Sequence, residues 1–595
     1  MILLLNEASC NKRINMTKKE NKILNDMAAK RQVADICIKN AKVVDVFNEE
    51  VFESDVLISG KYIAGFAEKG TGKAIKVVDA EGKYMIPGLI DSHVHIESSH
   101  CSPSEFSNLL IPNGVTTVVA DPHEICNVTG LAGLDYMLEA SKRLPLNAYF
   151  MIPSCVPATS FEHSGATILA EDIATRIDND RVLGLGEMMD YPGVIAGTDM
   201  VHDKLAVARN HNKIVDGHSP NIYNEDLDAY AASGIKTDHE CATPQELKDR
   251  IRRGMYVMVR QGTVCEDEVT LLKGVNDSNY HRCLFCTDDR QASSLLTEGS
   301  INNNVRLAVK EGLDPIKALC MATINSANCY NLKNIGGIAP GYIASFSITD
   351  NLKDFVMDQV FVEGQLAAKN GQMLNPTTPM DLPDAIKGKC NVKNFSKERL
   401  AIKLKGNRVR TIDIIPGGVV TSAGEATVKT KNGEFVYDPS QDIVKIAVVE
   451  RHKATGNVAV ALIRGYGIKS GAIATSVAHD SHNIIVCGTN DEDMATAVEE
   501  LIRMGGGMTV VKDKEVLGSF AQPIAGLMSN KKATEVTEST ERLSELAHNE
   551  LKVSRTIDPF MTLCFMSLPV IPVYKLTDMG LFDVRKFDFV PVELS

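Results

Sequence analysis

Two histidines separated by one residue end an apolar segment in the first fifth of the chain. His93 and His95 lie in the stretch PGLIDSHVHIESSH, residues 87–100. On a β-strand, residues i and i+2 point to the same side, so the two imidazoles would project together. Neutral imidazoles suit a divalent transition metal. A histidine pair alone could equally be one buried and one solvated side chain, so a metal site requires further ligands.

Four more residues with ligand-type side chains follow apolar runs further along the chain: Glu187, His218, His239 and Asp288. Starting from His95, the intervals correspond to one, two or three units of about 31 residues, with one shorter unit, as expected for βα units in a (β/α)8 barrel. Side chains that follow the strands of such a barrel converge at one end. The spacing therefore predicts a metal centre with six ligands, namely the histidine pair and these four residues.

The size of this ligand set predicts more than one ion. Six ligands exceed the four that a tetrahedral ion needs. Glu187 could bridge two ions with its two oxygens, and ions about 3.5–4 Å apart would hold a bridging hydroxide as nucleophile. Asp288 accepts hydrogen bonds only when ionised, so we expect it to take the hydroxide proton and pass it to a leaving group. Glu187 and Asp288 are thus the predicted catalytic residues.

The elements that would position these ligands lie between residues 86 and 332, where β-type apolar runs alternate with helical patterns. Eight such runs in about 250 residues match the size of a (β/α)8 barrel, whose catalytic face is the C-terminal end of its strands. The first strand is expected at residues 85–90. The runs lie at residues 85–95, 115–124, 147–158, 181–190, 212–220, 234–243, 254–263 and 282–289.

The flanks of this region predict two further units. Residues 34–85 and 333–387 show short alternating runs with Gly, Asn and Asp between them, which favours one small β-sandwich formed from both flanks. Residues 388–595 mix strand-like runs with two amphipathic helices and predict a C-terminal α+β domain. Residues 1–33 are expected to be an N-terminal extension. The predicted fold is thus an α/β (β/α)8 TIM-like barrel, inserted in a β-sandwich and followed by this domain.

Composition and charge limit the partners and the location. The formal net charge of -13 argues against nonspecific binding to nucleic acid or to an anionic membrane. The 14 cysteines are scattered through 595 residues, which favours reduced thiols in a cytoplasmic protein. The apolar core at residues 2–5 is shorter than the ~7–15 residues of a secretory signal. No run reaches ~18 apolar residues, so no membrane span is expected.

Several stretches together resemble the adenine deaminase family of the amidohydrolase superfamily: PGLIDSHVHIESS, ADPHEICNV, VLGLGEMMD, DGHSP, TDHE, FCTDDR and SVAHDSHN. The similarity extends from about residue 34 to the C-terminal region. The pattern from HxH to Asp288 is common to the superfamily, whereas ADPHE, TDDR and Glu187 are more specific to adenine deaminases. Many members of the superfamily bridge their metals with a carbamylated lysine, and here LGLGEMM offers a glutamate.

The resemblance implies hydrolysis of adenine to hypoxanthine and ammonia in purine salvage. It also implies a binuclear divalent metal centre, with manganese or iron expected and zinc as an alternative. For contact with the purine ring nitrogens, His123 and Glu124 are the first candidates and Asp289 and Arg290 the second. Glu124 could instead cap the following helix, and Arg290 could form a structural ion pair. Adenine is the expected small-molecule partner, and a homo-oligomer, a dimer or larger, is expected.

Two other functions remain open from the sequence. The same barrel could serve another cyclic-amide or aminopurine hydrolase, because spacing does not define the substrate pocket. An inactive scaffold is disfavoured, because such a barrel should have lost ligands. The HIE and CLFC stretches match parts of a zinc cytidine deaminase motif, but they lie far apart, and Cys283 and Cys286 are expected to be buried strand thiols.

One polar cluster in the C-terminal domain has no assigned role: His479, Asp480, His482 and Asn483. Such residues favour turns, so a hydrogen-bonded loop or a subunit contact is the simpler interpretation. A lid or a further ion site is the functional alternative. The glycines at 505–507 follow a helical pattern without a preceding strand, so we interpret them as a helix stop and not as a phosphate loop.

Overall fold

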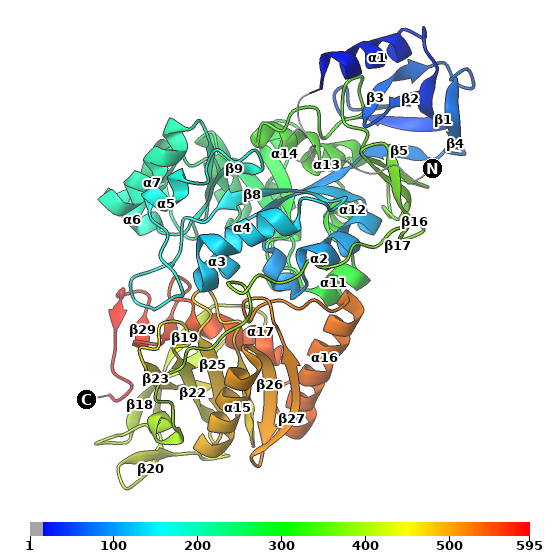
Figure 1. The fold of residues 1–595 in the computed structure, drawn as a ribbon. Coiled ribbons are helices and arrows are strands. Elements are labelled where there is room, and N and C mark those ends of the chain that lie inside the picture. The colour runs from blue at the N-terminus through cyan, green and yellow to red at the C-terminus, as the bar shows by residue number, and fades with distance from the viewer. Residues whose placement is uncertain (1–15, 595) are drawn as a thin grey trace.

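A closed ring of eight parallel strands occupies the centre of the computed structural model, which describes residues 16–594 (Figure 1). Strands β6 to β10 form one parallel sheet and β11 to β13 a second. The two sheets join where the Lys236 amide donates to the Val215 carbonyl at 3.0 Å, and where a bridge pairs Val94 with Asp288. The strands are β6 (Leu89–Val94), β7 (Val115–Ala120), β8 (Asn147–Ile152), β9 (Val182–Met188), β10 (Ile214–Gly217), β11 (Thr237–Asp238), β12 (Tyr256–Arg260) and β13 (Cys283–Cys286).

Each of the eight expected runs contains one of these strands, which confirms the predicted barrel. The first strand was placed too early. Residues 84–87 form β5 (Tyr84–Pro87), which belongs to another sheet, and the barrel strand begins at Leu89. Gly88 joins the two because the chain passes close to β7 there, where an added Cβ would lie 2.2 Å from Thr116 Oγ1.

Helices surround the barrel strands, which are buried almost throughout, as expected for a parallel sheet covered by helices. Cys283 and Cys286 are buried on β13, as predicted. The helices are α2 (Pro103–Leu110), α3 (His123–Thr129), α4 (Leu131–Ala140), α5 (Ala170–Ala174), α6 (Tyr191–Ala196), α7 (Asp199–Asn210), α8 (Asn224–Ala232), α9 (Pro244–Arg252), α10 (Glu268–Leu271), α11 (Ala292–Thr297), α12 (Ile301–Lys310), α13 (Pro315–Met321) and α14 (Ile324–Cys329).

Both flanks of the barrel contribute strands, as expected, but they form one nine-stranded sheet where a β-sandwich was predicted. Strand β14 from the later flank pairs antiparallel with β5 from the earlier one. The strands are β1 (Ala34–Asp45), β2 (Glu50–Ser59), β3 (Tyr62–Ala67), β4 (Ala74–Asp79), β5, β14 (Phe346–Thr349), β15 (Met357–Val362), β16 (Gln365–Lys369) and β17 (Gln372–Met373).

Part of the predicted N-terminal extension is a helix. Helix α1 (Lys18–Ala28) begins with a capping box between Thr17 and Glu20, and it buries Leu24 and Met27 in a core shared with β1 to β3. Burial of these two apolar side chains gives the helix a packing partner. The apolar run at residues 2–5 lies outside the described residues.

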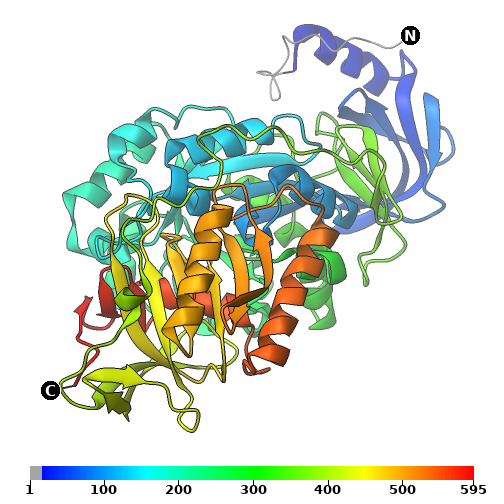
Figure 2. The ribbon, with the colours of Figure 1, turned by 60° about the horizontal axis from the view of Figure 1, so that its bottom comes forward.

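The C-terminal unit is an eight-stranded sheet in the order β19-β18-β23-β22-β25-β24-β26-β27 (Figure 2). Met494, Val498 and Leu501 of α15 pack on one face, as their spacing predicted. Positive φ angles at residues 505–507 confirm the helix stop. The strands and helices are β18 (Arg408–Ile414), β19 (Thr421–Thr427), β20 (Lys429–Lys431), β21 (Glu434–Val436), β22 (Ile443–Val449), β23 (Val458–Arg464), β24 (Ala472–Thr475), β25 (Ile484–Gly488), α15 (Asp491–Met504), β26 (Gly507–Lys512), β27 (Glu515–Ala521), α16 (Ala533–Glu550), α17 (Pro559–Cys564), β28 (Tyr574–Thr577), β29 (Gly580–Asp583) and β30 (Asp588–Phe589).

The C-terminal unit lies against the barrel on the side of α3 (Figure 1). The Ser529 amide donates to the His100 carbonyl at 2.8 Å, and the Ser102 amide donates to the Ser529 carbonyl at 3.0 Å. The Asn483 side chain donates to the His163 carbonyl at 2.8 Å. Since these barrel residues follow the C-terminal ends of strands, the unit covers the predicted catalytic face.

Candidate metal centre at the mouth of the barrel

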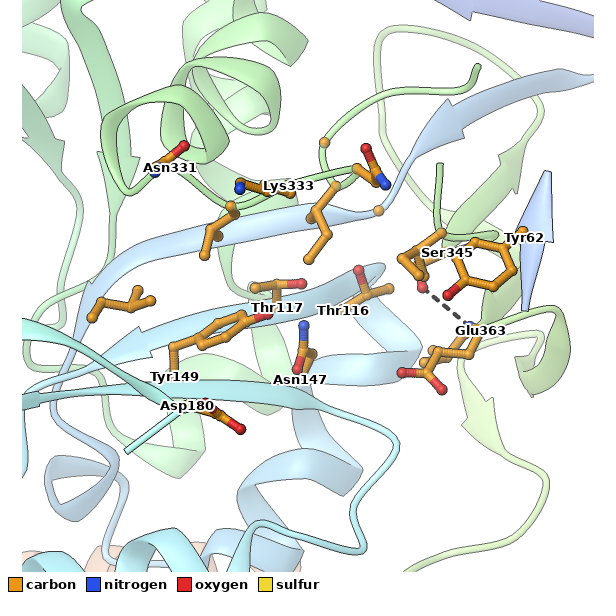
Figure 3. Close-up of a pocket in the computed structure, with 18 residues that line it drawn as sticks. Tyr62, Thr116, Thr117, Asn147, Tyr149, Asp180, Asn331, Lys333, Ser345 and Glu363 are labelled. Carbon is orange, nitrogen blue, oxygen red and sulfur yellow. Dashed lines mark hydrogen bonds between the residues drawn. The ribbon is translucent and has the colours of Figure 1, made fainter. Parts of the chain in front are cut away.

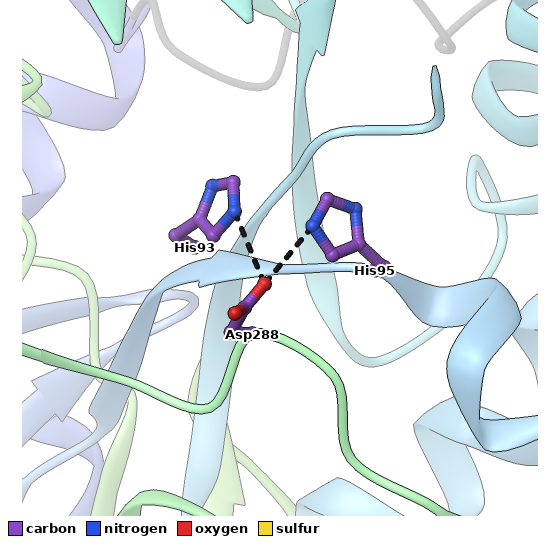
Figure 4. A group of neighbouring side chains, drawn as sticks. All are labelled: His93, His95 and Asp288. Carbon is purple, nitrogen blue, oxygen red and sulfur yellow. Dashed lines mark ion pairs between the residues drawn. The ribbon is translucent and has the colours of Figure 1, made fainter. Parts of the chain in front are cut away.

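The histidine pair faces a carboxylate that follows the last barrel strand (Figure 4). The pairing of Val94 with Asp288 sets the register, so both flanking histidines reach this carboxylate. Asp288 Oδ1 lies 3.1 Å from His95 Nε2 and 3.5 Å from His93 Nε2. All three side chains are buried. The structure therefore brings together the ligands predicted on the first and eighth strands.

Glu187, on β9, lies at the centre of the cluster, within 3.4 Å of four imidazoles and 4.0 Å from a fifth, that of His93. Its Oε1 is 3.4 Å from His95 Nε2 and 3.1 Å from His123 Nδ1. Its Oε2 is 2.8 Å from His218 Nδ1 and 3.2 Å from His239 Nε2. Each carboxylate oxygen thus faces a different pair of imidazoles. This is the arrangement expected of a carboxylate that bridges two ions.

The donor atoms fit a divalent metal. Neither ring nitrogen of His93 has a hydrogen-bond partner among residues 16–594, although the side chain is fully buried and stacks on His239 at 4.2 Å. Buried polar groups are rarely left unpaired, so these nitrogens call for a ligand. Several groups of ligand atoms lie within 4.8 Å of one another, and those in this cluster include His93, His95 and Asp288; His93, Glu187 and His239; and His95, His123 and Glu187.

Before a cation binds, the electrostatics favour ionised carboxylates and raise the pKa of His95, His123, His218 and His239, whereas burial lowers the pKa of His93. Burial alone would raise the pKa of Glu187 and of Asp288, but the surrounding histidines, and Arg260 beside Asp288, hold both pKa values well below the ordinary range. Burial lowers the pKa of His239, but its contact with Glu187 outweighs this and raises it to about 9. A cation that binds here must therefore displace protons from imidazoles.

The loop after β7 orients two of the ligands. The Asp121 carbonyl lies 2.9 Å from His95 Nδ1, and the Asp121 carboxylate accepts the Glu187 amide at 2.9 Å. A proton on Nδ1 of His95 leaves the lone pair of Nε2 free to bind a metal, which is the usual role of such a partner. Asp121 was not predicted, although it is the second residue of the ADPHE stretch.

Arg260 and Glu240 are also functional candidates that the sequence did not reveal. Arg260, the last residue of β12, donates to Asp288 Oδ2 at 2.9 Å and also pairs with Glu240 and with Asp267. Glu240 Oε1 lies 3.5 Å from His239 Nε2. The only signal was position, because Arg260 ends the seventh expected strand and Glu240 follows a predicted ligand. Arg260 holds the second oxygen of Asp288, so the first oxygen points to the histidines.

Three of the four predicted substrate-binding residues lie beside the cluster. His123 contacts Glu187, and its Nε2 is 3.5 Å from Glu124 Oε1. Glu124 does not cap α3, because Pro122 occupies the N-cap position and Glu124 contacts histidines of the C-terminal unit. Asp289 is half-buried, lines the same cavity and accepts a hydrogen bond from Ser98.

The structure corrects the prediction that Arg290 contacts the substrate. Its guanidinium donates to the carbonyls of Gln261, Gly262 and Gly299, and it pairs with Glu298 at 2.7 Å. All of these partners belong to loops around the barrel, and Arg290 does not line the cavity at the cluster. The predicted substrate contact is therefore wrong, and the alternative of a structural ion pair is confirmed. The reason is local, since backbone carbonyls exposed after β12 need a donor.

The C-terminal unit closes the outer side of the cavity at the cluster. His479 and Asp480 line it together with an apolar group formed by Val419, Phe565, Leu568 and Ile571. A second cavity adjoins it, sharing Glu124, Asp289 and His479. The His479 cluster is a hydrogen-bonded loop, as the simpler interpretation held, and this loop also lines the cavity at the ligand cluster. The contact joins segments more than 350 residues apart, and no local pattern signals it.

Another cavity lies at the opposite end of the barrel, between its strands and the nine-stranded sheet (Figure 3). Its lining includes Thr116, Asn147, Tyr149, Lys333 and Glu363, close to the N-terminal ends of β7 and β8. Residues at that end of a barrel usually serve stability. The lining contains no histidine or cysteine, so the metal chemistry belongs to the other end.

Two further observations concern the described residues only. The 13 cysteines within residues 16–594 are unpaired. No helix in that range is long and apolar enough to cross a membrane.

Comparisons with known proteins cover nearly the whole chain. The model of the amidohydrolase family matches residues 84–367, and that of the adenine deaminase C-terminal domain matches residues 418–588. Adenine deaminase 2 of Desulfotalea psychrophila is 52% identical over 97% of this chain and 100% of its own. Adenine deaminase of Nitratidesulfovibrio vulgaris is 48% identical over 95% of this chain and 98% of its own. Adenine deaminase 2 of Carboxydothermus hydrogenoformans is 48% identical over 96% of this chain and 99% of its own.

Proposed function

Because the chain belongs to the adenine deaminase family of amidohydrolases, we propose that it hydrolyses adenine to hypoxanthine and ammonia at the mouth of the barrel. The observation that carries the proposal is the division of Glu187 between two pairs of imidazoles. Asp288 stands against the histidine pair, as a proton acceptor beside a bridging carboxylate should.

A pair of divalent cations in this donor set would act as a Lewis acid that makes water a nucleophile at neutral pH. His93, His95, Glu187, His218, His239 and Asp288 would hold the cations. Manganese or iron suits a set of imidazoles and carboxylates without thiolates, and zinc is the alternative.

The protons of the reaction must balance. Water forms a C6–O bond, the C6–N bond breaks, and the two water protons end on the departing ammonia and on the ring nitrogen beside C6. Asp288 is ionised and is fixed by Arg260, so it can accept one proton and deliver it to the amine. Glu124 is ionised and lines the same cavity, so it can accept the second proton and pass it to the ring nitrogen.

The cavity suits a flat aromatic base. Apolar side chains of the C-terminal unit, including Phe565 and Leu568, face the polar cluster across it. A purine would place its apolar faces against these side chains and its nitrogens toward His123, Glu124 and Asp289.

The test is ammonia release by purified protein loaded with manganese or ferrous iron. Adenine, adenosine, guanine and dihydroorotate are compared as substrates, which separates adenine deamination from other aminopurine or cyclic-amide hydrolysis. We expect turnover of adenine alone or far above the others. Turnover of adenosine without adenine would refute the proposal.

Two expectations accompany the function. A homo-oligomer, a dimer or larger, is proposed from the resemblance alone, and light scattering after gel filtration tests it. A cytoplasmic location is supported by the unpaired cysteines within residues 16–594, and cell fractionation tests it.

A further inference from the structure

Two histidines of the C-terminal unit, His479 and His482, contact the carboxylate of Glu124. Glu124 lies in the first turn of α3 and is buried. Its Oε1 is 2.8 Å from His479 Nδ1, and its Oε2 contacts His482 Nε2. Both oxygens therefore have an imidazole partner from a loop more than 350 residues away in sequence.

The hydrogen bonds around His482 determine its tautomer. The Ala478 amide donates to His482 Nδ1 at 3.1 Å, so Nδ1 is an acceptor. A neutral imidazole then carries its proton on Nε2, which lies against Glu124 Oε2. A metal on Nε2 would require a proton on Nδ1, which would face the Ala478 amide. The tautomer of His482 therefore favours a carboxylate held between two imidazoles over a third ion site.

The ring of His479 is fixed by the segment that follows α17. It stacks on Phe565 with centroids 4.4 Å apart and 13° between the planes. The His479 amide donates to the Cys564 carbonyl at 3.0 Å, and the Ser567 hydroxyl donates to the His479 carbonyl at 3.1 Å. These contacts leave Nδ1 directed at Glu124.

The loop that carries both histidines is itself anchored. Arg451 is fully buried, donates its amide to the Asn483 side chain at 3.1 Å and donates its guanidinium to the His482 carbonyl. Asn483 in turn donates to the His163 carbonyl of the barrel. The two imidazoles are therefore held rigidly before substrate arrives.

From this geometry we propose that His479 and His482 are positioning residues for deamination, which fix the carboxylate of Glu124 at the edge of the substrate cavity. The C-terminal unit is then part of the active site. This inference rests on the proposed function, in which Glu124 contacts the purine. An unheld carboxylate would rotate, and the loss of such supporting partners typically costs ~10–100-fold in activity.

The experiment is a mutant cycle on the manganese-loaded protein, with kcat and KM measured from ammonia release. His482→Phe removes the Nε2 donor, and we expect kcat to fall ~10–100-fold with two ions still bound. His482→Gln places an amide donor near the position of Nε2 and should recover part of the loss. His548→Phe is the matched control, because His548 bonds the Val553 carbonyl and does not line either cavity at Glu124, and it should leave kcat unchanged.

The double variant separates positioning from a merely structural role. If His482 acts through Glu124, then Glu124→Gln with His482→Phe should be no slower than Glu124→Gln alone. The inference would be overturned if the losses in kcat of the two single variants multiplied in the double variant, or if His482→Phe left kcat unchanged. A third bound ion that His482→Phe loses would also overturn it. Circular dichroism, used to monitor unfolding, identifies a variant that fails to fold. If His482→Phe fails to fold, the comparison of kcat between His482→Gln and wild type tests the inference instead.

Failure of the proposed function gives a different result. Wild-type protein that does not deaminate adenine would refute that function. The contact would still be tested by ¹⁵N NMR of the histidine rings, where we expect His482 to carry its proton on Nε2. A proton on Nδ1 instead would overturn the inference.

Discussion

Replacement of Asp288 by asparagine tests the proposed proton acceptor with almost no change in shape. Asp288 Oδ1 faces His95 and His93, and Oδ2 accepts from Arg260 at 2.9 Å. The amide oxygen of asparagine can keep the bond to Arg260, but the amide nitrogen then faces the histidines and cannot accept a proton. A general base typically contributes ~10²–10⁴-fold to the rate. We therefore expect kcat to fall by that factor, or about 2.7–5.4 kcal/mol in activation free energy.

Stability should change much less than activity. A hydrogen bond to a charged group contributes ~1.5–3 kcal/mol and a neutral one ~0.5–1.5, so the exchange should cost about 1–2 kcal/mol of unfolding free energy. Arg260 keeps its pairs with Glu240 and Asp267. Metal should be retained in part, because five ligands remain.

The assay is steady-state ammonia release, with metal content and urea unfolding measured on the same samples. Asp267→Asn is the matched control, since it also removes a carboxylate from Arg260, at 2.9 Å, but lies outside the ligand cluster. It should keep far more activity than Asp288→Asn. An Asp288→Asn protein with wild-type kcat, or an equal loss in both variants, would refute the role of Asp288.

Three further predictions follow from the same geometry. Glu187→Gln should lower the number of bound ions per chain and abolish deamination, because a neutral amide replaces the carboxylate between two pairs of imidazoles. Native mass spectrometry counts the bound ions, and two retained ions would contradict this prediction. Metal affinity should rise with pH, because contact with Glu187 raises the pKa of His239 to about 9 and a cation that binds below pH 9 must displace its proton. Chelator competition at pH 6.5, 7.5 and 8.5 measures the affinity, and an affinity that stays flat or falls with pH would contradict the prediction. Gly88→Ala should destabilise the protein by ~1–3 kcal/mol in urea unfolding, because the new Cβ would lie 2.2 Å from Thr116 Oγ1; unchanged stability would show that the strand can shift.

The ligand cluster was predictable because a barrel repeats along the chain. Each βα unit brings the residues at the end of its strand to the same end of the barrel, so types and spacing alone predicted that His93, His95, Glu187, His218, His239 and Asp288 lie together. Arg260 also ends a strand, yet its type did not identify it, since an arginine there can equally form a structural ion pair. The opposite error concerned Arg290, whose partners are backbone carbonyls that no sequence pattern reveals.

The contacts between the barrel and the C-terminal unit could not be predicted from the sequence. His479 and His482 meet Glu124 only because the sheet of the C-terminal unit packs over the barrel, and nothing in the local pattern specifies that packing. The start of the first barrel strand was misplaced for a related reason. Residues 84–94 form one apolar run, and the division at Gly88 arises from a close approach to Thr116 in another element.

The most direct test of the central claim is a metal titration of the metal-free protein with adenine as substrate. Protein stripped with a chelator is supplied with increasing manganese, and ammonia release is plotted against ions bound per chain. The account predicts no activity without metal and a rise that saturates at two ions per chain. Deamination of adenine by metal-free protein, or the absence of deamination at full metal loading, would contradict it.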